Sequence, residues 1–159
     1  MSESPRVAAG AFKGPSRTQG KPRRGSSEFA GHSGIAGRTY PPVTFQIDAE
    51  RAAAFARAIG ADLAAGVPPT FAAVYSLGAT APQLFSEDEA AIDFARLLHA
   101  EQEFTWVRHP GVDETVTSTG HVASDVSRRG MRFVTFETDT VDRSGEPVCH
   151  SKALFVIRS

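Results

Sequence analysis

The fold of this chain is decided by the stretch PPTFAAVYSLGATA, residues 68–81. Proline is tolerated in the first turn of a helix, so the Pro68-Pro69-Thr70 step predicts a helix start. The large apolar side chains of this helix lie on more than one side of it; they are Phe71, Val74, Tyr75 and Leu77. A helix with so wide an apolar surface is buried, and we expect a sheet to wrap it.

The chain after this helix predicts an antiparallel sheet. A short helical stretch over residues 86–97 comes first, capped by Ser86 and the acidic residues behind it. The hydrophobic period then changes to two, which predicts strands at residues 102–107, 115–126, 131–141 and 148–157, with a turn at 143–146. Consecutive antiparallel strands after a buried helix indicate the α+β class, with one sheet curled around one helix.

The chain before the helix predicts one strand and one amphipathic helix. Residues 43–47 alternate between apolar and polar side chains, which is typical of a short strand. Asp48 is a good N-cap, and apolar residues then recur at helical spacing up to Ile59, where Gly60 ends the helix. A short connection over residues 62–66 leads to the helix start at Pro68.

Residues 1–39 differ in composition from the rest of the chain. They are rich in Gly, Ser, Pro, Arg and Lys, so they cannot bury enough apolar surface to offset the entropy lost on ordering. We therefore interpret them as a disordered tail, and residues 40–159 as one folded domain. The basic cluster Lys21-Pro22-Arg23-Arg24 is interpreted as part of a solvated tail, with contact to an acidic partner or to nucleic acid as the alternative.

Composition narrows the class of function. Hydrophobic residues make up 41% of the chain and the formal net charge is −1, which gives no global attraction to nucleic acid or membrane. No apolar run approaches the roughly 20 residues that span a bilayer. Cys149 is the single cysteine, which excludes an internal disulfide and favours a reducing, cytoplasmic setting. Without a Gly-rich phosphate loop or metal-ligand spacing of histidines, we expect neither a nucleotide cofactor nor a metal.

Five segments, in order, resemble MaoC-like dehydratases of the N-terminal-domain type. They are Tyr40-Pro41-Pro42-Val43, residues 55–62, Pro68-Pro69-Thr70-Phe71, residues 98–104 and Gly145-Glu146-Pro147-Val148. The resemblance covers nearly all of residues 40–158 and implies a hot-dog fold, in which an antiparallel sheet wraps a central helix. It also implies a thioester ligand on CoA or acyl carrier protein, a role in fatty-acid metabolism, and a dimer, because the acyl groove of this family lies between two hot-dog units.

The acid–base pair of this family is incomplete in the sequence. Hydration of an enoyl thioester needs a base that activates water and an acid that protonates the α-carbon. The R-specific hydratases that this chain resembles supply an Asp and, a few residues later, a His. Asp62 lies where the Asp is expected, but no His follows it before Pro68, and the next histidine is His99.

We therefore expect no catalytic residue in this chain, with Asp62 and His99 as the fallback candidates. The alternative role of Asp62 is to cap or solvate a turn after Gly60. The alternative role of His99 is structural hydrogen bonding or interface contact at the start of a strand.

A second difference concerns the oxygen of the thioester, which gains negative charge during the reaction. In catalytic relatives a glycine near the start of the central helix offers its N–H to this oxygen. By the resemblance, Pro69 holds that position, and proline has no N–H to donate. A register shift of one residue would instead place the amide of Thr70 there.

The candidates for substrate binding are Thr70, Phe71, Trp106, Arg128 and Arg129. Thr70 and Phe71 lie at the predicted helix start. Trp106 is a candidate for the lining of an acyl tunnel, with ordinary core or dimer packing as the alternative. Arg128 and Arg129 are candidates for the phosphates of CoA or of a carrier arm, and the alternative is a solvated hairpin end.

These observations predict a scaffold and substrate-binding subunit of an (R)-specific enoyl-thioester hydratase or 3-hydroxyacyl-thioester dehydratase, which is a lyase. The catalytic Asp and His would come from a partner hot-dog subunit in a heterodimer, and a homodimer is the alternative. A non-catalytic acyl-CoA-binding protein is the second hypothesis. An acyl-CoA thioesterase is the third, and it is disfavoured because the helix from Thr70 to Ala81 has no carboxylate to activate water.

Overall fold

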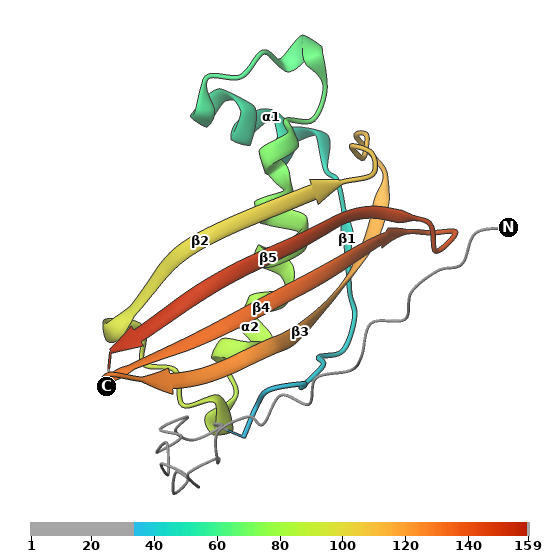
Figure 1. Cartoon of the computed structure of the whole chain (residues 1–159). Helices are drawn as coiled ribbons and strands as arrows, with labels where there is room; N and C mark the ends of the chain where they lie inside the picture. The colour runs from blue at the N-terminus through green and yellow to red at the C-terminus, as the bar shows by residue number, and fades with distance from the viewer. Residues whose placement is uncertain (1–33, 159) are drawn as a thin grey trace, which may run out of the picture.

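The computed structural model describes residues 34–158, which form a five-stranded antiparallel sheet around a central helical segment (Figure 1). The strand order is β1-β3-β4-β5-β2. The strands are β1 (Val43–Gln46), β2 (Leu97–Trp106), β3 (Thr115–Arg128), β4 (Met131–Asp142) and β5 (Pro147–Arg158). The predicted α+β class is confirmed, and the long hairpins β3–β4 and β4–β5 follow the predicted turns.

The central helical segment lies behind the sheet in Figure 1 and changes its winding along its length. It begins as a 3₁₀ turn, η2 (Pro69–Phe71), continues as a π-helical turn, η3 (Ala73–Leu77), and ends as the α-helix α2 (Gly78–Phe85). The segment thus runs four residues past the predicted end at Ala81, with Pro82 inside α2. Proline removes one helical donor, but burial of Leu84 against the sheet keeps the last turn in place.

The core lies between this segment and the inner face of the sheet. One cluster of buried residues surrounds α2 and includes Leu84, Val122 and Phe136. A second surrounds the helix start and includes Phe71, Tyr75 and Val148. Of the apolar residues that predicted a wrapped helix, Phe71 and Tyr75 are almost completely buried, whereas Val74 and Leu77 are partly buried and pack against these clusters.

The helix α1 (Ala49–Ile59) has the predicted ends. The carboxylate of Asp48 accepts a hydrogen bond from the Arg51 backbone N–H at 2.8 Å. Gly60 ends the helix with a φ of 69°, a left-handed conformation that glycine adopts without a Cβ penalty. A short 3₁₀ turn, η1 (Leu63–Ala65), follows in the connection to the central segment.

Residues 34–39, which the sequence analysis assigned to the tail, contact the folded domain. Ile35 is only 1% exposed and belongs to the core around α2. The backbone N–H of Gly37 donates to the Val122 carbonyl at 2.8 Å, and Thr39 forms a β-bridge with His121. Residues 34–39 therefore belong to the folded domain rather than to the tail. The basic cluster at residues 21–24 lies outside the described residues.

The segment between the central helix and β2 contains two short 3₁₀ turns, η4 (Asp88–Ala90) and η5 (Phe94–Arg96), where one helical stretch was expected. Strand β2 then starts at Leu97, five residues before the predicted start at Gln102. A bulge between His99 and Glu101 breaks the two-residue alternation, which hid the first half of the strand from a periodicity argument. Within residues 34–158, no helix is long and apolar enough to cross a membrane.

Candidate functional site

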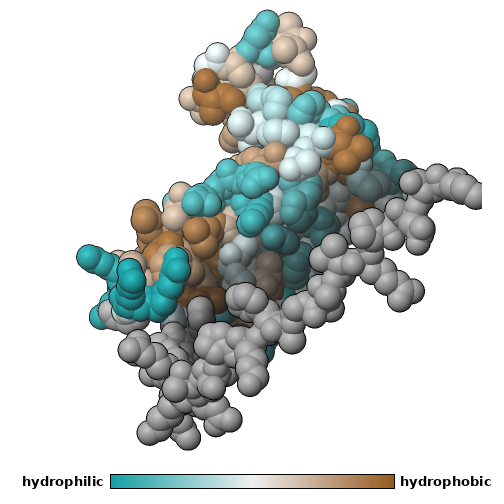
Figure 2. All heavy atoms as spheres, viewed as in Figure 1, coloured by the Kyte–Doolittle hydropathy of each residue, from teal (hydrophilic) through white to brown (hydrophobic). Residues whose placement is uncertain are grey.

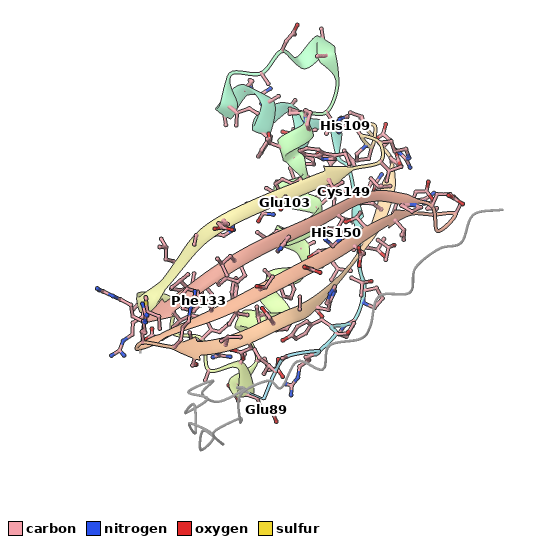
Figure 3. All side chains as sticks on the ribbon, in the orientation of Figure 1. Glu89, Glu103, His109, Phe133, Cys149 and His150 are labelled. Atoms are coloured by element: carbon pink, nitrogen blue, oxygen red, sulfur yellow. The ribbon has the colours of Figure 1, made fainter. Side chains whose placement is uncertain are left out.

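The predicted site residues divide between two ends of the molecule. The first, here called the helix-start end, contains Thr70, Trp106 and Cys149, since Trp106 lies directly across from Cys149 in the β2–β5 pairing. The second, here called the arginine end, contains Arg128, Arg129 and the end of β5 at Arg158. Figure 3 labels Cys149 and His109 at the first end and Phe133 near the second.

The two ends are far apart. Cys149 and Arg158 are separated by nine residues of β5, which corresponds to roughly 30 Å of extended chain. A single ligand would have to cover this length to contact both Thr70 and Arg129. The structure therefore does not bring together the five residues that the sequence suggested for substrate binding.

Thr70 is exposed in the first turn of the central segment. The N–H groups of a first helical turn have no intrahelical acceptor, so the Thr70 amide is available to an oxygen of a ligand. Pro69, one residue earlier, is also exposed but has no N–H. Of these two neighbouring positions, Thr70 is the one with an amide to donate.

Phe71 is part of the core rather than of an open surface. Its side chain is 0% exposed. Its ring centroid lies 5.2 Å from that of Phe55, 6.3 Å from that of Phe45 and 6.4 Å from that of Tyr75. These edge and tilted contacts use the whole ring, so Phe71 positions the helix start against α1 and β1.

Trp106 is partly buried at the end of β2. Its ring packs against Phe104 at 5.6 Å and against the exposed His109 at 5.4 Å between centroids. Its indole Nε1 is buried and has no hydrogen-bond partner within residues 34–158. Trp106 therefore carries a buried donor without an acceptor, whether it lines a tunnel or packs in the core. The sequence did not reveal this feature.

Three other buried side-chain atoms in the described part of the chain also lack a hydrogen-bond partner: Tyr75 Oη, Ser76 Oγ and Gln102 Oε1. Together with Trp106 they come from two elements, the π-helical turn η3 and strand β2. Buried polar groups are normally paired, and π-helical turns occur frequently at functional sites. Both η3 and β2 therefore carry buried polar atoms whose hydrogen-bonding capacity is unused within residues 34–158.

The Tyr75 hydroxyl lies close to two other polar groups. Cys149 and Trp106 are its polar neighbours, but neither is placed for a well-formed hydrogen bond. Burial raises the pKa of Tyr75 well above its ordinary value, and burial also raises the pKa of Cys149. Both groups therefore stay protonated at neutral pH, so Cys149 is a packed thiol rather than a nucleophile.

Sequence reasoning singled out neither Tyr75, Ser76 nor Gln102 as a site residue. A signal existed for Gln102, because the strand alternation placed it on the same face as Phe104 and Trp106. A polar side chain on an otherwise aromatic inner face needs a partner. Its amide nitrogen finds one in the Ser151 hydroxyl at 3.2 Å, whereas its oxygen does not.

Asp62 and His99 do not form a pair. The Asp62 carboxylate is exposed and accepts a hydrogen bond from the Ala64 backbone N–H at 2.9 Å, which caps the turn η1. His99 is exposed near the start of β2, with its ring 5.1 Å from that of Phe155. Seven residues of β2 separate His99 from Trp106, roughly 23 Å along the strand, so the imidazole is remote from the helix start.

Arg128 and Arg129 form the tip of the β3–β4 hairpin. The guanidinium of Arg128 lies over the Phe133 ring, 4.8 Å from its centroid. Arg129 has a φ of 51° and leads into Gly130 in the tight turn. Arg129 lines an open hollow of about 540 Å³ together with Arg96 and Arg158. Within residues 34–158, no group of three His, Cys, Asp or Glu side chains is placed to hold a metal ion.

Solved structures share this arrangement of sheet and helix. A chain of the HadBC complex, a (3R)-hydroxyacyl-ACP dehydratase of Mycobacterium tuberculosis, is similar with a TM-score of 0.61 and 20% identity, covering 77% of this chain and 96% of that chain. A MaoC-like dehydratase is similar with a TM-score of 0.67 and 17% identity, covering 80% and 43%. A chain of the ChsH1–ChsH2 complex of M. tuberculosis is similar with a TM-score of 0.58 and 16% identity, covering 76% and 84%. The fold is therefore that of a MaoC-like hot-dog domain, as the resemblance predicted.

The family follows from the sequence itself. Residues 35–151 match the FAS1-like, dehydratase domain region. The chain is also 36% identical over 117 residues to a UPF0336 protein of Leifsonia xyli subsp. xyli, which covers 74% of this chain and 73% of that protein. This chain therefore belongs to the FAS1-like dehydratase-domain family and is a relative of the UPF0336 proteins.

Proposed function

We propose that this chain is the scaffold and substrate-binding subunit of an (R)-specific enoyl-thioester hydratase, or 3-hydroxyacyl-thioester dehydratase. The observation that carries the proposal is a dehydratase-family hot-dog domain in which Asp62 caps a turn and is followed in the sequence by no histidine before His99. A partner hot-dog subunit would supply the catalytic Asp and His. The two similar complexes, HadBC and ChsH1–ChsH2, support a partner of this kind.

The division of work follows from the chemistry of hydration. A base removes a proton from water, the hydroxyl oxygen bonds to C3 of the enoyl group, and an acid delivers a proton to C2. In the proposed complex the partner performs both proton transfers. This chain would contribute binding, with the amide of Thr70 available to an oxygen of the ligand and Trp106 beside the acyl chain. Degradation of acyl-CoA or elongation of fatty acids is the proposed setting.

The direct test is hydration of a short trans-2-enoyl-CoA by the purified chain, alone and with a candidate partner subunit that carries the full Asp–His motif. We expect no turnover above background from the chain alone and turnover from the mixture, above that of the partner alone. Turnover by the isolated chain would overturn the proposal.

Two variants sharpen this test. Asp62→Asn and His99→Ala should leave the turnover of the mixture within about twofold, because neither side chain is placed for proton transfer. If Asp62→Asn lowered the turnover of the mixture a hundredfold or more, this carboxylate would instead have to be counted as catalytic. Binding of the enoyl-CoA without turnover in any mixture would favour the second candidate, a non-catalytic acyl-CoA-binding protein.

A further inference from the structure

Three arginines line the hollow at the arginine end, and each comes from a different segment of the chain. Arg96 lies in the turn η5, Arg129 in the two-residue turn between β3 and β4, and Arg158 at the end of β5. Figure 2 shows hydrophilic atoms projecting from this end, and Figure 3 shows side-chain nitrogens there. Uncharged residues complete the lining: Ala95, Gly130 and Met131. All the charged side chains of the lining are therefore cations.

Two of these three guanidinium groups have no partner within residues 34–158. The side chains of Arg129 and Arg158 form no ion pair or hydrogen bond there. Arg96 contacts Asp93 at 3.4 Å, but both side chains are more than half exposed, so solvent and salt weaken this pair. Like charges around one hollow repel each other, and an anion in the hollow would replace this repulsion with attraction.

The backbone at Arg129 is strained. The two-residue turn Arg129-Gly130 has φ values of 51° and 72°. Turns with positive φ at both central residues favour Asn, Asp or Gly at the first of them, because most other side chains crowd the backbone there. Strain of this kind occurs frequently at binding sites. Arginine therefore stands at the hairpin tip although asparagine would fit the turn better, which indicates a use for the guanidinium.

Phosphate is the anion that suits this lining. A guanidinium group forms paired hydrogen bonds with phosphate oxygens, and three such groups from three segments can contact more than one phosphate. The hollow of about 540 Å³ lies within the range of small-molecule sites, roughly 300–1,000 Å³. The formal net charge of the whole chain is −1, so the attraction for an anion is local to this end.

We propose that the arginine end binds a diphosphate group through Arg96, Arg129 and Arg158. Free nucleoside diphosphates and CoA both carry such a group. Roughly 30 Å of β5 separate Arg158 from Cys149, so this site is distinct from the thioester site proposed at the helix-start end. The inference goes beyond the proposed function and does not depend on it, because it uses no residue of the helix-start end.

Calorimetric titration of the full chain with inorganic diphosphate tests this inference. We expect the wild-type chain to bind diphosphate, and the affinity to fall as the salt concentration is raised. Arg129→Asn/Arg158→Gln should weaken binding about tenfold or more, because it removes two of the three cations. Asparagine tolerates a positive φ, so urea denaturation should show that this variant is no less stable than the wild-type chain. Absence of binding by the wild-type chain, or equal binding by the folded variant, would overturn the inference.

The matched control removes the same charge elsewhere. Arg57→Gln/Arg143→Gln alters two exposed arginines outside the arginine end and should leave diphosphate binding within about twofold, because salt screens distant charges. An equal loss with this control would show a general effect of net charge and would contradict the assigned site.

Titrations with ADP, CoA and adenosine identify the source of the diphosphate. Tighter binding of CoA than of ADP, lost in Arg129→Asn/Arg158→Gln, would assign the site to the thioester carrier. Equal affinities, lost in the same variant, would assign it to a free nucleotide. Adenosine has no phosphate, and its binding as tightly as ADP would contradict a phosphate site. Because no turnover is measured, failure here is distinct from failure of the hydration test.

Discussion

At the scale of single residues, the most completely buried charge within residues 34–158 is the carboxylate of Asp125, whose side chain is 0% exposed. Arg132 holds both of its oxygens, with Nε to Oδ1 at 2.8 Å and Nη2 to Oδ2 at 2.7 Å. The remaining guanidinium nitrogen of Arg132 donates to the Ala90 carbonyl. This fork fixes the turn η4 to the sheet, because Asp125 and Arg132 lie on β3 and β4.

Loss of this arginine should be one of the costliest single changes in the chain. Arg132→Met removes the guanidinium and leaves the buried carboxylate in place, which typically costs about 3–5 kcal/mol of unfolding free energy. Urea denaturation measures this change. Arg132→Met/Asp125→Leu, which removes both charges, should recover most of the loss. A loss below about 1 kcal/mol in the single variant would contradict the assigned role.

At the scale of elements, the helix and the sheet are tightly packed at Gly120 on β3. A Cβ built at this position would lie 2.4 Å from Cζ of Phe136 and 3.1 Å from Cβ of Thr80. Phe136 is 0% exposed, so its ring has no free space into which to move. Beside this contact, the hydroxyls of Thr80 and Thr138 share a hydrogen bond at 3.0 Å. The absent side chain of Gly120 therefore sets the distance between α2 and the sheet.

Gly120→Ala should accordingly destabilise the fold by overpacking. Forcing one methyl group into a packed core costs about 1–3 kcal/mol. Thermal or urea unfolding gives the change, with Gly111→Ala as the control, because a Cβ at Gly111 meets nothing within 4 Å. Gly111→Ala should stay within about 0.5 kcal/mol of the wild-type chain. Equal stability of the two variants would mean that the helix can move away from the sheet at little cost.

The elements show which parts of the fold a sequence can predict. The ends of α1 were predictable because Asp48 and Gly60 act on residues within one turn of themselves. The bulge at β2 was not, because it is seen only when His99 and Glu101 are set against β5. Residues 34–39 were missed for the same reason, since their order depends on bonds to β3, more than 80 positions away.

For the candidate site, the sequence suggested single residues but not how they are arranged. Thr70 and Trp106 were named from the sequence, and the structure places both at the helix-start end. Arg129 was named with them, yet it lies about 30 Å away because β5 separates the two ends. The topology of the sheet decides at which end a hairpin lies, and a local sequence pattern does not predict it.

At the scale of the whole molecule, an ion-pair network joins two connections at the helix-start end. Arg108, just after β2, contacts Glu114 at 2.5 Å and Asp142 at 2.8 Å. Glu114 precedes β3 and Asp142 ends β4, so one guanidinium ties the β2–β3 loop to the β4–β5 turn. Asp142 also accepts hydrogen bonds from Ser144, including its hydroxyl at 2.6 Å. These contacts close the same end of the sheet on which Trp106 lies.

The network should make global stability fall in acid. Hydrogen bonds from Ser144 and Arg108 hold the pKa of Asp142 well below its ordinary value of 3.8, and Arg108 lowers the pKa of Glu114 from 4.5. Groups with a depressed folded pKa stabilise the native state above their unfolded pKa, and they lose that contribution as the pH falls through the folded pKa. Arg108 stays protonated throughout, because its own pKa is raised by the two carboxylates.

We therefore expect the contribution of Asp142 and Glu114 to the unfolding free energy to be nearly constant above about pH 5. It should decline steadily below about pH 4.5. Urea denaturation of the wild-type chain and of Arg108→Gln across this range measures the effect. The variant should be less stable at neutral pH and should lose less on acidification, so that the two curves converge at low pH. Arg143→Gln is the matched control, because Arg143 donates to the Thr115 hydroxyl rather than to a carboxylate and should keep the wild-type pH dependence. Parallel curves for the wild-type chain and Arg108→Gln would contradict this role of Arg108. They would show that the backbone and hydroxyl donors of the turn, rather than Arg108, stabilise the two carboxylates.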